Sequence, residues 1–540
     1  MFQQLRRLSA CVIAAVVIAS AEEYGGFGAN QNPGLSCSYE GEHWSWVSRP
    51  WVGPDGTIYL LGSSGEVVCR TEKQGDNSVP QPDWTYGPGR NYLHALKPDG
   101  TQKWRSSLVV VRDIVGIAPL GTVYMAHDHS LYAVDSKGAR MLEFAFNGES
   151  AWLDFAPDGT IYLTSASPPP DCCLAMDLAR RDGKNLTSAS LPPGCCGKGQ
   201  VRGLGAGGVL YALKADGTQK WKMSAQSRPI VGPDGTLYLT AGNLLYTVDP
   251  EGKRKWSVSL GKGSIRALRS PQLKSRSAWA VYVVGSDNLY AVAPSGVEKW
   301  KFPFTGPPSW LGFGPDGTAY VPANTAMGQG RVYALKIDGS QKWKFDAPGE
   351  VYGVRVGRKG AIYVEGGGRD SDSPLPYIYH TGLFEAGAPP MHSGGQLYTL
   401  KSDGTLRWEL VCQADSGQCP GAGLKLLPEG TLESQGAWDN GMYGFQVLRV
   451  GPDDSLYFLE YMGLWGGYAV AVGPDGDASW QVGEGGGQPE DFAFAFGADG
   501  TVYLPHNPSD EEPGRGALYA FTPAGDQKWS FDPRNFANAQ

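Results

Sequence analysis

The sequence lacks the short motifs that define several well-characterised enzyme and cofactor-binding classes. It has no Cys-x-x-Cys-His haem-attachment motif, no pair of Cys-x-x-Cys motifs for zinc, no Gly-x-Ser-x-Gly elbow and no His-Glu-x-x-His motif. The glycine runs at 366–368 and 485–487 do not lead from a strand into a helix, so they do not predict phosphate-binding loops. The function classes that these motifs define are therefore excluded.

A strong charge bias is also missing. The chain has 46 Lys and Arg residues against 54 Asp and Glu residues, a formal net charge of −8. This balance offers neither a basic face for nucleic acid nor a polybasic membrane anchor. Beyond the N-terminus, no apolar run is long enough to span a bilayer. We therefore expect neither nucleic-acid binding nor a transmembrane span.

The N-terminus has the pattern of an export signal. Arg6 and Arg7 precede a mostly apolar run over residues 8–19, and Ala19-Ser20-Ala21 is a small-residue cleavage site. We predict a signal peptide over 1–21 and an N-terminal segment over 22–47. The mature protein is then exported to the periplasm or the extracellular medium.

Eight cysteines would remain after cleavage, since Cys11 lies in the signal peptide. Cys11 precedes most of the apolar run instead of following it, so we do not expect it to be lipidated. An even number of cysteines in an exported chain favours disulfides. We predict four structural disulfides, with the pairing inside the two adjacent-cysteine sets left open. The candidates are Cys37, Cys69, Cys172, Cys173, Cys195, Cys196, Cys412 and Cys419.

The chain is rich in glycine (76) and proline (39) and is built from two alternating phrases. One phrase first appears as Ala95–Trp104 (Ala-Leu-Lys-Pro-Asp-Gly-Thr-Gln-Lys-Trp), and a copy at Ala133–Leu142 has Leu in place of Trp. The other phrase first appears as Gly53–Leu60 and contains a Tyr in all nine copies; its glycine is replaced twice. The later Trp-ending copies end at Trp221, Trp256, Trp300, Trp343, Trp408, Trp480 and Trp529, and the two glycine replacements are Trp279 and Asp454.

Each pair of phrases predicts a four-stranded antiparallel sheet. Pro-Asp-Gly is turn chemistry, and short alternating apolar runs flank each turn, so each phrase predicts a hairpin. We name the four strands of a unit A to D; the Tyr is on B and the Trp on D. Such sheets bury both faces only by packing around a ring. We predict an all-β fold with a single closed β-propeller of nine units over 48–535, its Trp and Tyr filling the gaps between units; eight blades is the alternative.

The pattern Leu-Tyr-Ala-Leu-x-x-Asp-Gly-x-x-x-Trp resembles the repeat of the quinoprotein-type (PQQ-like repeat) propellers. That superfamily includes pyrroloquinoline quinone (PQQ) dehydrogenases. It also includes non-enzymatic relatives such as the propeller lipoprotein of the bacterial outer-membrane β-barrel assembly machinery. Members of the superfamily usually have eight blades, whereas this chain has nine repeat units.

The dehydrogenase branch implies a Ca²⁺ site of Glu, Asn and Asp beside the quinone, and in some members a disulfide between neighbouring cysteines. Cys172-Cys173 and Cys195-Cys196 could resemble that disulfide, but two such pairs in one insertion favour cross-linking. We identify no matching Ca²⁺ constellation. We therefore predict no catalytic residue, no metal site and no cofactor, and expect the non-enzymatic branch.

The long insertions predict a binding face. Four follow strand B, at 61–91, 164–208, 365–395 and 505–516, and one follows strand D, at 411–446. In a propeller blade these connections lie on the same face, and one-sided insertion is typical of a binding surface. The candidate contact residues on that face are Trp438, Tyr377, Tyr379, His127, Asp128 and His129.

His127-Asp128-His129 lies in a short connection after strand B of the second unit. Two His residues around an Asp could bind a metal, but no third ligand is identifiable, so we expect an exposed turn. Together these features predict a monomeric binding or scaffold propeller that engages a protein or glycan partner. The alternative is a PQQ- and Ca²⁺-dependent oxidoreductase.

Overall fold

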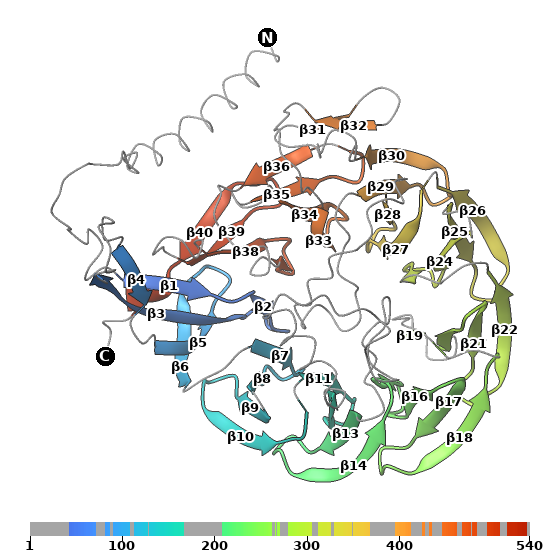
Figure 1. The fold of residues 1–540 in the computed structure, drawn as a ribbon, viewed down its shortest axis with the longest axis horizontal. Helices are drawn as coiled ribbons and strands as arrows, with labels where there is room; N and C mark the ends of the chain where they lie inside the picture. The colour runs from blue at the N-terminus through green and yellow to red at the C-terminus, as the bar shows by residue number, and fades with distance from the viewer. Residues whose placement is uncertain are drawn as a thin grey trace, which may run out of the picture. The chain divides into compact units, whose positions relative to one another are not determined.

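The structure is a computed structural model, and the ring of sheets it contains is shown in Figure 1. The residues that it describes are 43–71, 82–86, 90–108, 113–127, 129–148, 150–166, 208–261, 265, 267–269, 279–304, 311–325, 329–347, 349–367, 395–411, 424–426, 431–434, 445–461, 467–476, 478–482, 494–507 and 516–536.

Nine antiparallel sheets, which we number as blades 1 to 9, follow one another along the chain. Blade 1 contains β1 (His43–Val47), β2 (Trp51–Val52), β3 (Ile58–Thr71), β5 (Arg90–Leu96) and β6 (Gln102–Leu108); blade 2 contains β7 (Asp113–Ile117), β8 (Val123–His127), β9 (Ser130–Val134) and β10 (Arg140–Ala145); blade 3 contains β11 (Ser150–Phe155), β12 (Ile161–Ala166), β13 (Gly208–Leu213) and β14 (Gln219–Ala225). Blade 4 contains β15 (Ile230–Val231), β16 (Leu237–Ala241), β17 (Leu244–Val248) and β18 (Arg254–Ser259); blade 5 contains β19 (Ala267–Arg269), β20 (Val281–Val284), β21 (Asn288–Val292) and β22 (Glu298–Pro303); blade 6 contains β23 (Gly312–Phe313), β24 (Ala319–Asn324), β25 (Gly330–Leu335) and β26 (Gln341–Asp346). Blade 7 contains β27 (Val351–Val356), β28 (Ile362–Gly367), β29 (Gly395–Leu400) and β30 (Leu406–Val411), extended by β31 (Leu424–Leu426) and β32 (Thr431–Ser434); blade 8 contains β33 (Phe445–Val450), β34 (Leu456–Tyr461), β35 (Gly467–Val472) and β36 (Ala478–Val482); blade 9 contains β37 (Ala495–Phe496), β38 (Val502–His506), β39 (Ala517–Phe521) and β40 (Gln527–Phe531), followed by the short 3-10 helix η7 (Pro533–Phe536).

The chain forms two compact units. Residues 43–65 and 88–540 make up the ring, and residues 1–42 and 66–87 make up the other unit. In that other unit the structure describes one hairpin, where the far part of β3 pairs with β4 (Pro82–Tyr86), Val67 opposite Tyr86 and Thr71 opposite Pro82. The nine-unit prediction is confirmed: the described sheets form a nine-bladed β-propeller and not the eight-bladed alternative.

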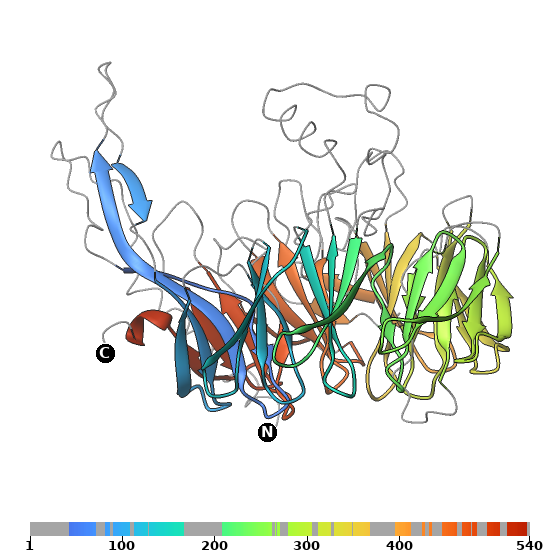
Figure 2. The ribbon, with the colours of Figure 1, turned by 90° about the horizontal axis from the view of Figure 1, so that it is seen from below.

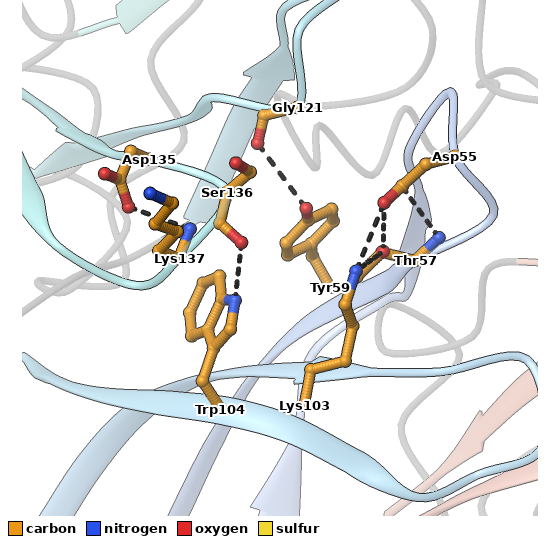
Figure 3. Close-up of polar contacts among 9 residues, drawn as sticks. All are labelled: Asp55, Thr57, Tyr59, Lys103, Trp104, Gly121, Asp135, Ser136 and Lys137. Atoms are coloured by element: carbon orange, nitrogen blue, oxygen red, sulfur yellow. Dashed lines mark hydrogen bonds and ion pairs between the residues drawn. The ribbon is translucent and has the colours of Figure 1, made fainter.

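The predicted Pro-Asp-Gly turns form as expected, and Figure 3 shows the one at Asp55 in blade 1. The Asp55 carboxylate accepts hydrogen bonds from the Thr57 backbone N at 3.0 Å and the Thr57 hydroxyl at 2.7 Å. Lys103, on the outer strand of the same blade, donates to the Thr57 hydroxyl at 2.7 Å and to Asp55 at 3.2 Å. The last strand of the blade, β6, is thus joined to the turn between β2 and β3. The equivalent lysines Lys220, Lys342 and Lys528 reach the same turn in blades 3, 6 and 9.

The repeated tryptophan joins neighbouring blades. Trp104 Nε1 donates to the Ser136 carbonyl at 2.8 Å, in the turn between the last two strands of blade 2 (Figure 3). Gly138 in that turn has φ +90°, and a Cβ on it would lie 2.9 Å from the Trp104 ring, so only glycine fits. Among the described residues six more tryptophans donate to the corresponding carbonyl of the next blade: Trp221, Trp256, Trp300, Trp343, Trp408 and Trp529.

The last of these bonds closes the ring, since Trp529 of blade 9 donates to the Pro98 carbonyl of blade 1 at 2.9 Å. A second link adds to it. The Asn507 side chain accepts from the Val47 backbone N at 2.9 Å and donates to the Val47 carbonyl at 2.8 Å. Asn324 makes the same two bonds to Val351 between blades 6 and 7. The ring therefore includes β1, which lies inside the predicted N-terminal segment 22–47.

Two irregular turns compensate for each other. Blade 7 has Lys359 and Ala361 where most turns have Asp and Thr, and blade 8 has Asp454 where most have glycine. Asp454 is buried with φ 71°, and its carboxylate accepts hydrogen bonds from Lys359 N at 2.9 Å and Ala361 N at 3.0 Å. The carboxylate that the turn of blade 7 lacks is thus supplied by blade 8.

We expect Trp256→Leu to destabilise the ring by about 2–3 kcal/mol, because it removes packed aromatic surface and the hydrogen bond to the Pro294 carbonyl. Chemical denaturation measures the change. Leu142 already occupies the equivalent position under Gly217, so Leu142→Trp is the matched reverse change. An unaltered denaturation midpoint for Trp256→Leu would contradict the role given to the tryptophans.

We expect Asp454→Gly to lower stability by about 1–2 kcal/mol, because the buried N–H of Ala361 and the partly buried N–H of Lys359 lose their acceptor and the relieved backbone strain offsets only part of the loss. Restoring the usual residues in both turns, with Lys359→Asp, Ala361→Thr and Asp454→Gly together, should recover the melting temperature. A single Asp454→Gly variant that is more stable than the native protein would refute cross-turn capping.

Candidate binding face and inner wall of the ring

The strand register places the described ends of the insertion-bearing connections on one face of the ring. Ser165 pairs with Val209, Gly367 with Gly395, and His506 with Ala517, so each pair marks the end of its hairpin at which an insertion leaves and returns. The Pro-Asp-Gly turns close the opposite ends of these sheets, along the lower side of the ring in Figure 2. The described turns and the strand ends at which these three insertions leave are therefore on opposite faces of the ring.

Two predicted insertions contain strands. Residues 61–65, at the start of the first, remain in β3 and pair with β5, Leu61 opposite Leu93. In the insertion at 411–446, β32 pairs in parallel with β30, Glu409 opposite Thr431, and β31 pairs with β32. This adds two strands to the outer edge of blade 7, as Figure 1 shows. That part of the insertion consequently lies at the outer edge of the ring.

Most candidate contact residues and cysteines lie outside the described residues. They are Trp438, Tyr377, Tyr379, Asp128, Cys37, Cys172, Cys173, Cys195, Cys196, Cys412 and Cys419. Cys69 is in β3, in register with Trp84 of β4. The disulfides and the aromatic contacts on the insertion-bearing face remain predictions.

The two candidate histidines lie at the ends of adjacent strands. His127 ends β8 and is in register with Ser130, while His129 immediately precedes β9. His129 Nδ1 donates a hydrogen bond to the Gly148 carbonyl at 2.8 Å. In the described part of the chain no three His, Cys, Asp or Glu side chains are grouped so that they could hold a metal ion.

Charged pairs on the inner strands were not anticipated from the sequence. The first strand of each blade lies toward the centre of the ring (Figure 1). Arg228, which precedes β15, donates to Asp154 of β11 with Nε–Oδ2 2.8 Å and Nη2–Oδ1 2.7 Å, and Nη2 also donates to the Leu153 carbonyl at 3.0 Å. This bidentate pair ties the inner strands of blades 3 and 4 together.

Two further arginines belong to this inner wall. Arg355 of β27 forms an ion pair with Glu365 of β28, whose side chain is 9% exposed. The Arg49 guanidinium lies 4.7 Å from the ring centroid of Trp51. Arg49 and Arg228 share the tripeptide Ser-Arg-Pro, at 48–50 and 227–229. That repetition is the signal that could have revealed the inner wall.

The Ser-Arg-Pro serines also act alike. The Leu61 backbone N donates to the Ser48 hydroxyl at 2.9 Å, and the Thr240 backbone N donates to the Ser227 hydroxyl at 2.8 Å. Each serine replaces a backbone acceptor where the following proline interrupts strand pairing. The tripeptide thus holds an arginine at a fixed position on the inner wall.

The pKa shifts of the ring have structural causes. Hydrogen bonds donated by Thr160 lower the pKa of Asp158 in its turn, and burial raises the pKa of Tyr282 to about 12. These groups remain a carboxylate and a neutral phenol near neutral pH, held in turns and between blades. Within the described ranges, the pKa shifts of these carboxylates and phenols follow from burial, turn hydrogen bonds and nearby lysine or arginine side chains.

None of the helical segments in the described part of the chain has the length and hydropathy needed to span a bilayer.

Comparison with known protein families agrees with the repeat. A PQQ-type repeat model described as "Outer membrane protein assembly factor BamB" matches residues 176–309. The matched residues belong to a ring whose described sheets form a nine-bladed β-propeller. No curated protein sequence matches the chain.

Solved structures match the chain at low sequence identity and with TM-scores below 0.5. The crystal structure of a eukaryotic initiation factor has a TM-score of 0.49 and 9% identity over 82% of this chain and 93% of that chain. The Dos1 propeller has a TM-score of 0.41 and 11% identity over 86% of this chain and 92% of that chain. BamB from Moraxella catarrhalis has a TM-score of 0.36 and 11% identity over 71% of this chain and 89% of that chain.

We expect the Arg228–Asp154 pair to show a coupling energy of about 1 kcal/mol in a double-mutant cycle of Arg228→Gln and Asp154→Asn, because it is bidentate and about three-quarters buried. The Lys344–Asp346 pair, about half exposed on the outer strand β26, is the matched control and should show no measurable coupling. Equal coupling in the two cycles would argue against a special role for the inner pair.

Proposed function

We propose that this protein is an exported, non-enzymatic binding or scaffold propeller that engages a protein or glycan partner through its insertion-bearing face. The observation that carries the proposal is the strand register, which directs the ends of three B–C insertions to one face, while the described turns at the opposite ends of these sheets are short. A rigid ring that presents variable segments on one side suits partner recognition.

The match to a family described as an outer membrane protein assembly factor supports a scaffold role. The predicted signal peptide over 1–21 supports export to the periplasm or the extracellular medium. The protein acts as a monomer in this proposal and requires no cofactor. The contact residues on the insertion-bearing face are Trp438, Tyr377 and Tyr379.

The proposal is tested by shortening the insertions without altering the ring. Gly367 and Gly395 are directly paired, so residues 368–394 can be replaced by Asn-Gly, which closes a two-residue hairpin. The native mature protein and this variant serve as baits against the exported fraction of the source cells. We expect captured partners to be lost with the variant, because its binding surface is reduced.

Leu120→Asp is the matched control, since Leu120 is 89% exposed in a turn on the opposite face. It should retain every partner. Partners lost with Leu120→Asp but kept by the shortened variant would place binding on the turn face and refute the proposal.

A titration with PQQ and Ca²⁺, followed by absorbance and thermal shift, separates this function from an oxidoreductase. We expect no saturable binding and no change in melting temperature, because the described residues hold no metal-binding group of three. Saturable binding with a raised melting temperature would favour the dehydrogenase and contradict the proposal.

A further inference from the structure

The junction between blades 9 and 1, which we call the seam, differs from every other junction in one respect. Each other pair of neighbouring blades is joined by the chain itself, which runs from the last strand of one blade into the first strand of the next. At the seam only non-covalent contacts among the described residues join the two blades. They include apolar packing and three sets of hydrogen bonds, which are the Trp529–Pro98 bond, the Asn507–Val47 bonds and the Ser45–Gly516 bonds.

His94 lies in the seam. It belongs to β5 and occupies the position of the tyrosine in the Leu-Tyr-Ala-Leu phrase, where blade 3 has Tyr211 and blade 6 has Tyr333. Phe531 of blade 9 packs edge-on against the imidazole with ring centroids 5.1 Å apart, as Phe302 of blade 5 packs on Tyr333. A titratable ring therefore replaces a neutral one at the closing junction.

The two imidazole nitrogens of His94 have different surroundings. Nδ1 lies 3.0 Å from Gln102 Oε1, an acceptor, so Nδ1 carries the proton of the neutral ring. Nε2 is buried and has no hydrogen-bond partner among the described residues. Nε2 faces Gly62 of β3, because a Cβ added to Gly62 would lie 2.9 Å from it. Pro533, which follows β40, is packed at the same place, with its Cβ 3.1 Å from that added atom. A neutral ring tolerates this site, but a protonated Nε2 needs an acceptor that the site does not provide.

The charged and titratable groups around His94 do not compensate for a positive charge. On β6, Arg105 is directly opposite His94 and its guanidinium lies over the ring of Tyr92, a neighbour on β5. On β40 the contacting residue is Phe531, and on β3 it is Gly62. Among the described residues after β40, 532–536, Asp532 is the one acidic group, and both of its carboxylate oxygens accept hydrogen bonds from Arg534.

We propose that the seam is an acid-sensitive closure, which loosens when His94 is protonated while the other blade junctions stay intact. Protonation places an unpaired charge between blades 1 and 9, beside Arg105. The seam is where this matters most, because blades 1 and 9 can separate there without any strain on a chain connection.

The direction in which pH changes seam closure follows from the burial of His94. Burial lowers the pKa of His94 from 6.5 to about 4. The open seam, in which the ring is exposed, therefore binds the proton more tightly than the closed seam. Closure is favoured above pH 6.5 and weakens as the pH falls toward 4. The opening equilibrium should rise about 100-fold between pH 7 and pH 4.

Hydrogen exchange with mass spectrometry, corrected for intrinsic exchange rates, tests this on the full mature chain. Peptides from β5–β6 and β39–β40 report on the seam, and peptides from β21–β22 and β25–β26 are internal controls. We expect seam protection to fall by about 100-fold between pH 7 and pH 4 and control protection to change only a few-fold. A seam that loses no more protection than the controls overturns the proposal.

Two variants isolate the imidazole. His94→Tyr introduces the residue found in most other blades, and Gly285 and Tyr290 of blade 5 show that tyrosine fits beside a glycine at this position. His94→Asn keeps a small polar side chain that can still bond Gln102. We expect either folded variant to lose the extra acid sensitivity of the seam, and His129→Asn, on blade 2, to retain it. An acid response that persists in His94→Asn, or that disappears in His129→Asn, would show that another group titrates.

Discussion

The hydrogen bond from an indole N–H to a carbonyl in the next blade is the interaction on which the ring depends. Each tryptophan is held by its own outer strand and reaches a turn of the following blade, so one contact fixes the spacing of two sheets. The glycine of that turn leaves room for the indole face, as Gly252 does for Trp221. Repetition of this contact around the ring, ending at Trp529 and Pro98, makes the curvature uniform enough for nine blades to close.

The fold could be predicted from the sequence because its determinants are local and periodic. Trp, Tyr and the turn glycine recur at fixed spacing, and each acts within its own blade or on the adjacent one. Even the substitution at Leu142 keeps its place, since Leu142 packs under Gly217 as tryptophan does elsewhere. The one-sided insertions followed from the same logic, because strand order alone determines at which face a connection emerges.

The Arg228–Asp154 pair of the inner wall could not be predicted because its two residues are far apart in the sequence, and the repeated Ser-Arg-Pro marks the arginine without its partner. Arg228 and Asp154 are 74 positions apart, and neither belongs to a repeated phrase that specifies a partner. The strands within the insertions also lacked a signal, since β32 pairs in parallel with β30 and not through a hairpin turn. The buried environment of His94 depends on Phe531 and Pro533, which the ring brings back from the other end of the chain.

Most blades of this ring are equivalent modules, since each contains its own turn carboxylate and its own glycine. Blades 7 and 8 are not, because the buried carboxylate of Asp454 completes the turn of its neighbour. Duplication or exchange of a single blade would leave most of the ring intact, but separation of these two would leave one turn without an acceptor and the other with a strained aspartate. The pair must therefore be inherited together, and it fixes the order of the repeats at one point in an otherwise interchangeable series.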